Sequence, residues 1–156
     1  MYKKTGMVLA ILLLLITIQS ITYFFLVLKV SFIEWVFFNA CAPSNLLFLA
    51  GYVMYLLSGN RVVLHMAIIP MFFFAITGLF IFPWDGFNIV PQICHFLMLL
   101  NIAWTFVTTF KTEDYKTAAI GILLGMIISV FIGFQQRYVI THRGDLKRLM
   151  QVEIKE

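Results

Sequence analysis

The chain has 156 residues, of which 62% are hydrophobic, 17% aromatic and only 12% charged, and its formal net charge is +4. Soluble globular domains are close to half apolar and about a quarter charged, so this composition excludes the soluble globular class. The few basic residues lie at the ends of the chain and between apolar segments, so a clustered basic surface for nucleic acid is also excluded.

Five apolar segments predict transmembrane helices, because a helix needs about 20 mostly apolar residues to cross the hydrocarbon of a bilayer. The segments are 7–28, 35–57, 62–82, 89–110 and 117–134. The connections between them, such as "SGNR" and "KTEDYK", are short. We therefore predict an all-α polytopic membrane protein, with a bundle of five transmembrane helices over 1–136 and a polar or amphipathic tail over 137–156.

Five crossings place the two ends of the chain on opposite sides of the membrane. Lys3 and Lys4 at the first end, against Lys29 alone at the second, favour a cytoplasmic N-terminus under the positive-inside rule. The tail "HRGDLKRLMQVEIKE" mixes both charges with apolar residues. A short amphipathic helix on the lipid head groups and a solvated tail are both compatible with that pattern.

The motif "FNACAPSN" places polar residues inside the second apolar segment. Cys41 and Asn45 are four residues apart and share one helical face, as Gln92 and His95 do at a spacing of three in the fourth segment. Cys41 lies six residues past Trp35 and His95 six past the start of its segment, so both are about 9 Å deep. Polar groups are costly in hydrocarbon, so both faces should point into the bundle and form one pocket. Pro43 should free the carbonyl of Asn39 to line it.

The chemistry of these residues favours a nucleophile and a base. A Cys41 thiol next to a neutral His95 imidazole is the usual way in which a weak nucleophile is activated. Asp85 or Glu34 would fix the tautomer of His95 as an orienting acid.

Amide side chains can stabilise a developing oxyanion. Substrate-binding candidates are therefore Asn39, Asn45 and Gln92. We expect no metal and no cofactor, because His65 and His95 lie near opposite faces of the membrane. Cys94 points away from His95 and is expected to pack, and His65 is expected at the interface.

The segments "CAPSNLLFLAGYVMYLL", "LHMAIIPMFFFAITGLFIFP" and "VPQICHFLMLLNIAW" resemble the layout of YwaF-like bacterial membrane proteins and of the transmembrane-protein-164 group of lipid acyltransferases. The resemblance covers roughly residues 38–105. It implies transfer of fatty acyl groups between phospholipids through a cysteine and a histidine, which fall on Cys41 and His95. It also implies an integral protein of a prokaryotic cell membrane.

Two other classes of function are compatible with the sequence. A carrier or channel-like protein would use the amides of Asn39, Asn45, Gln92 and Asn101 to coordinate a small polar solute. A non-enzymatic subunit or assembly factor fits the short chain and its short loops, and cysteine in a membrane helix is more often a packing residue than a reactive one. We expect membrane lipids as partners and do not expect nucleic acid. Both a homo-oligomer and a complex with another membrane subunit are compatible with the composition.

Overall fold

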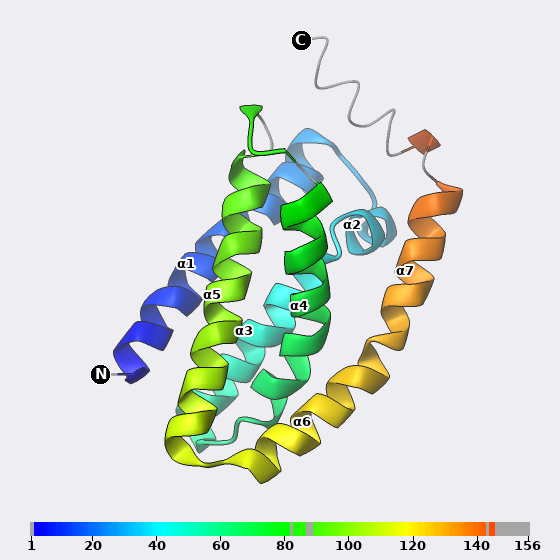
Figure 1. Cartoon of the computed structure of the whole chain (residues 1–156). Coiled ribbons are helices and arrows are strands. Elements are labelled where there is room, and N and C mark those ends of the chain that lie inside the picture. Colours follow the sequence, from blue (N-terminus) through cyan, green and yellow to red (C-terminus); the bar gives the residue numbers. More distant parts are fainter. Residues whose placement is uncertain (1, 82, 87–88, 143, 146–156) are drawn as a thin grey trace.

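The structure is a computed structural model that describes residues 2–81, 83–86, 89–142 and 144–145, and these residues form an all-α bundle (Figure 1). The elements in chain order are α1 (Tyr2–Thr22), the π-helical turn η1 (Tyr23–Val27), α2 (Phe32–Phe38), α3 (Cys41–Ser58), α4 (Val62–Ile81), α5 (Ile89–Thr112), α6 (Tyr115–Ile128) and α7 (Val130–Thr141). The chain runs up and down the bundle, and α1 begins at the end opposite to that at which α7 ends.

Among the described residues, five spans are long and apolar enough to cross a bilayer, which agrees with the predicted number. They are Lys3–Val27, Cys41–Ser58, Val62–Phe80, Ile89–Thr112 and Tyr115–Thr141. Side chains such as Leu57 and Phe80 are more than four-fifths exposed, whereas Asn45, His65 and Gln92 are almost completely buried. An apolar outer surface with the polar side chains buried among apolar ones is the arrangement that hydrocarbon requires, because a bilayer offers no water to polar groups. The chain is therefore an integral membrane protein.

The predicted second helix is wrong in one respect, because it is not continuous. It breaks after Phe38, so that the short α2 lies across the bundle and α3 starts anew at Cys41 (Figure 1). Pro43 is the third residue of α3, and proline is tolerated there because the first N–H groups of a helix have no partner within it. The carbonyl of Asn39 is not freed as predicted, since it accepts a hydrogen bond from the N–H of Ala42 at 3.0 Å.

Small residues let α4 pack closely against its neighbours. A methyl group at Gly51 of α3 would meet the backbone of Val63 at 2.9 Å, and one at Gly125 of α6 would meet the carbonyl of Met66 at 2.6 Å. Pro70 cannot donate to that Met66 carbonyl within α4. Glycine thus brings the backbones together, as is common in membrane helix packing.

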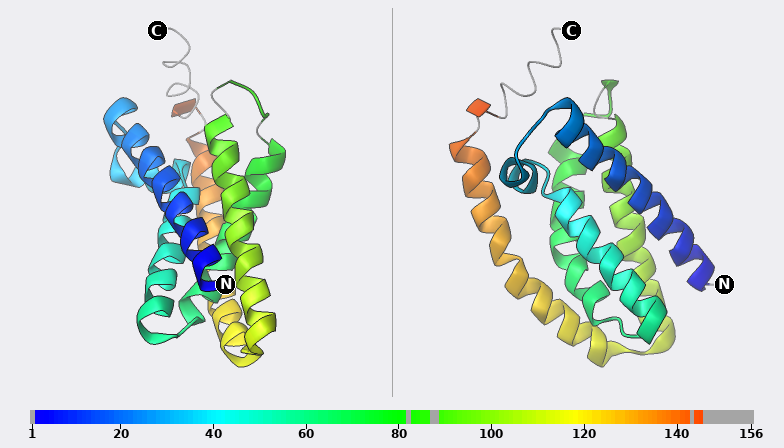
Figure 2. Two further views of the ribbon diagram at one scale, coloured as in Figure 1. Left: turned by 90° about the vertical axis from the view of Figure 1, so that its left-hand side faces the viewer. Right: turned by 180° about the vertical axis from the view of Figure 1, so that it is seen from behind.

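The fifth span bends at Ser129, between α6 and α7. The Ser129 hydroxyl donates to the carbonyl of Gly125 at 2.8 Å, a type of bond that often bends helices. Beyond the bend, α7 packs on α2, where Tyr138 stacks on Phe37 with ring centroids 4.3 Å apart and the Gln135 amide donates to the Phe37 carbonyl at 2.7 Å. Figure 2 shows α6 and α7 as one bent arm along the bundle.

The predicted tail 137–156 begins inside α7, which continues to Thr141. Residues 146–156 lie outside the described residues, so the amphipathic helix expected there stays a prediction.

Candidate functional site

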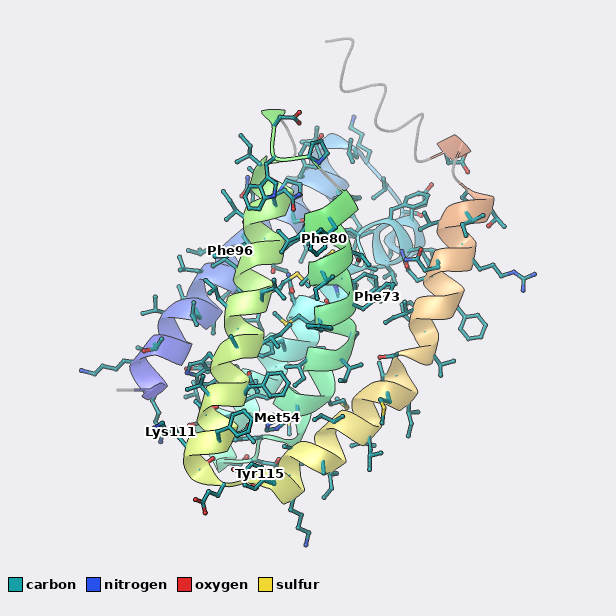
Figure 3. The ribbon with its side chains drawn as sticks, in the orientation of Figure 1. Met54, Phe73, Phe80, Phe96, Lys111 and Tyr115 are labelled. Carbon is teal, nitrogen blue, oxygen red and sulfur yellow. The ribbon has the colours of Figure 1, made fainter. Side chains whose placement is uncertain are left out.

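The thiol of Cys41 and the imidazole of His95 meet inside the bundle. Cys41 is the first residue of α3 and His95 lies in the second turn of α5. The Cys41 Sγ is 3.3 Å from the His95 Nε2, within hydrogen-bonding distance for sulfur. Phe96, the neighbour of His95 labelled in Figure 3, marks the height of the pair in the upper half of the bundle. The predicted contact between Cys41 and His95 is therefore present. The depth predicted for Cys41 assumed one continuous helix from Trp35, whereas the two residues lie on separate helices.

Gln92 sets the tautomer of His95. The Gln92 Nε2 donates to the backbone carbonyl of Leu79 at 3.4 Å, which directs the Gln92 Oε1 towards the His95 Nδ1 at 3.3 Å. An amide oxygen can only accept, so Nδ1 carries the proton and donates it. Nε2 is then the acceptor nitrogen, and it is the nitrogen that faces the Cys41 thiol. With this tautomer, the lone pair of Nε2 is the group that can accept a proton from the Cys41 thiol.

Close packing fixes the position of the imidazole. His95 is only 4% exposed. Its ring lies directly against Gly78 of α4, where a methyl group would overlap the ring atoms. The ring therefore sits between the backbone of α4 and its own helix α5, and it has no room to swing away from Cys41.

Neither Glu34 nor Asp85, the two predicted orienting acids, is the group that contacts the Nδ1 of His95. Glu34 forms a capping box at the start of α2, where its Oε2 accepts from the hydroxyl and the N–H of Ser31 at 2.6 and 2.7 Å. These hydrogen bonds lower the pKa of Glu34. Asp85 lies in the exposed turn that follows α4. The amide of Gln92, which was predicted to bind substrate, is the group found at the orienting position of His95.

Asn39 and Asn45 form hydrogen bonds to α1 and do not surround the Cys41–His95 pair. The Asn39 amide donates to the Ser20 hydroxyl at 2.8 Å, and the Asn45 amide donates to the Thr17 hydroxyl at 3.1 Å. Asn45 also reaches the Sγ of Cys94 at 3.5 Å. The contacts of Asn39 and Asn45 favour a role in helix packing over the predicted substrate binding, because both amides form hydrogen bonds between helices.

His65 is buried inside the bundle near the start of α4, and its expected depth at the membrane interface stays a prediction. It is 0% exposed, with Nδ1 2.8 Å from the Arg61 carbonyl and Nε2 2.7 Å from the Thr109 hydroxyl. It therefore links α4 to α5. The sequence contains a pattern that indicates a partner for His65: the threonines at positions 105, 108, 109 and 112 have the helical spacing of a polar face on α5.

Comparisons with protein-family models, with curated proteins and with solved structures find no match for this chain.

Proposed function

We propose that this integral membrane protein transfers fatty acyl groups on phospholipids, with Cys41 as nucleophile and His95 as general base. The observation that carries the proposal is the 3.3 Å contact between Sγ and Nε2, with the opposite ring nitrogen held by Gln92. A nucleophile next to a base that a third group orients is the arrangement expected of covalent catalysis.

The reaction begins with both side chains neutral, because a buried pair of charges is costly in apolar surroundings. The Sγ attacks the carbonyl carbon of a phospholipid ester while Nε2 takes the thiol proton. The C–O bond of the ester then breaks, and His95 returns the proton to the leaving alkoxide. The products are a lysophospholipid and a thioester on Cys41. The hydroxyl of a second lipid, deprotonated by Nε2, then attacks the thioester carbonyl. A new C–O ester bond forms, the C–S bond breaks, and His95 returns the proton to the Cys41 sulfur.

The location of the pair supports a lipid substrate. Cys41 and His95 lie near one end of two membrane-spanning helices, and the surrounding surface is apolar.

A carrier for small polar solutes is less well supported. That function would need amide groups directed at a passage. The amides of Asn39, Asn45 and Asn101 instead contact residues of α1.

The test is to detect the thioester. Purified full-length protein is reconstituted in phosphatidylcholine vesicles, quenched in acid and measured by intact mass, with and without hydroxylamine, which cleaves thioesters. We expect one acyl adduct on Cys41, none in Cys41→Ala, and formation slower by about 10²–10⁴ in His95→Gln, the range for loss of a general base. Cys94→Ala is the matched control and should keep the adduct. An adduct on Cys94, no adduct at all, or an unchanged rate in His95→Gln would refute the proposal.

A further inference from the structure

A cavity of about 100 Å³ lies between α3, α4 and the bend that joins α6 to α7. Its walls include Ala40 just before α3, Pro43, Ser44 and Leu47 of α3, Phe74 of α4 and Ile132 of α7. Apart from the hydroxyl of Ser44, these groups are apolar, and Ser44 uses that hydroxyl to donate to the Cys41 carbonyl at 2.7 Å. The cavity therefore offers no partner to a polar solute, and it adjoins the first turn of α3.

The direction of the cavity matches that of a lipid chain. The wall from Ala40, just before α3, to Leu47 spans eight residues, and their seven steps of 1.5 Å rise amount to about 10 Å. This wall starts beside Cys41 and descends towards the middle of the span, where Pro70 of α4 is also part of the lining. A phospholipid whose ester lies at Cys41 sends its chain the same way, from the head-group region towards the bilayer centre.

The outer wall is provided by the bend at Ser129. The arm passes from α4, which α6 contacts, to α2, which α7 contacts. Phe131 of α7 is part of the lining and is 40% exposed, so the cavity is not fully enclosed. All the helices that line it are membrane-spanning, so its surroundings are hydrocarbon. A cavity needs about 10–15 Å³ to hold one water-sized group, so about 100 Å³ has room for several such groups. The apolar lining fits a segment of an acyl chain rather than a polar head group.

We propose that this cavity binds the acyl chain of the phospholipid whose ester reacts at Cys41; the role of the cavity in catalysis rests on the proposed function. The chain enters between α4 and α7, and the fit of its upper segment holds the ester near the thiol. Lipid tails are as apolar as the protein side chains, so shape rather than hydrophobicity must select the chain. Filling the cavity should then exclude it.

The test uses phosphatidylcholine with a diazirine in the upper half of one acyl chain, reconstituted with the full-length protein and photolysed. We expect crosslinks to be enriched on peptides of α3, α4 and α7 that line the cavity, in the unmodified protein and in Cys41→Ala alike. Ile132→Trp should reduce these crosslinks severalfold. Val130→Trp is the matched control, because Val130 is on the same helix and is 64% exposed. Leu47→Phe fills the cavity from the opposite wall, should Ile132→Trp not fold.

The two proposals fail in different ways. Crosslinks spread evenly over lipid-facing residues, or unchanged in both cavity-filling variants, would overturn the binding site even if a thioester forms on Cys41. Enriched crosslinks that the filling variants abolish would support the binding site, and the absence of a thioester in the same preparation would then refute acyl transfer alone.

Discussion

Gly78 on α4 lies so close to the imidazole of His95 on α5 that a methyl group in place of its hydrogen would overlap the ring. Gly78→Ala should therefore displace the ring and separate Nε2 from the Cys41 thiol. We expect severalfold slower formation of the Cys41 thioester, even though alanine favours a helix by about 0.5–1 kcal/mol over glycine. The measurement is the rate of adduct formation by intact mass. Gly133→Ala is the control, since a methyl group there meets no atom within 4 Å; equal rates in the two variants would contradict the prediction.

Gln92 should act as a positioning residue for His95. Gln92→Leu keeps much of the volume but removes the acceptor for Nδ1, so the ring loses its preference for the tautomer that leaves Nε2 unprotonated. We expect acylation to be slower than in the unmodified protein. The reduction in rate should be smaller than the factor of about 10²–10⁴ that loss of the general base causes. The ¹⁵N chemical shifts of His95 should show a mixture of tautomers. Gln136→Leu at an exposed position is the control, and a single unchanged tautomer in Gln92→Leu would refute this role.

His65 should contribute to stability and not to the reaction. His65→Leu removes the link between α4 and α5 and leaves the Thr109 hydroxyl without its histidine partner. Interhelical hydrogen bonds in membrane proteins contribute about 0.6 kcal/mol on average and up to about 1.7 kcal/mol, so we expect a loss in that range. Unfolding in mixed detergent measures it. The folded fraction should still acylate Cys41 at the normal rate, and slower acylation by folded His65→Leu would show that the two sites are coupled.

The contact between Asn39 and Ser20 should stabilise the docking of α1. A double-mutant cycle with Asn39→Ala and Ser20→Ala isolates the pair, and we expect a coupling free energy of about 0.6 kcal/mol. Flux of small polar solutes into vesicles should not depend on either residue. A coupling near zero, together with a solute flux that Asn39→Ala abolishes, would favour the carrier interpretation instead.

The cap of α2 should respond to acid. The hydrogen bond from the Ser31 hydroxyl, followed by that from the Ser31 N–H, lowers the pKa of Glu34 below its usual value. A carboxylate with a lowered folded-state pKa stabilises the fold at pH values above its unfolded pKa, and this contribution is lost as pH falls through the folded value. Backbone amide exchange in α2, corrected for the intrinsic effect of pH, should therefore accelerate below about pH 4. Glu34→Gln should abolish this acid-dependent step, and an unaltered step in that variant would assign it to another group.

The sequence alone determined the class and the main pair of residues. Five long apolar segments leave a polytopic helical bundle as the solution, because every backbone polar group in hydrocarbon must be satisfied within its own helix. The same cost of polar groups directs Cys41 and His95 inward, so the 3.3 Å contact between them was predictable in kind although not in distance.

Only the tertiary structure determines which polar groups contact Cys41 and His95. Hydropathy does not distinguish a straight helix from one broken at Asn39 and Ala40, because both halves of the second segment are apolar. The orienting partner of His95 depends on Leu79, whose carbonyl on another helix turns the Gln92 amide. The partners of Asn39 and Asn45 likewise depend on where α1 docks. A single sequence gives the angular position of a side chain on its own helix, whereas hydrogen bonds between helices are set by how close and at what height the helices pack.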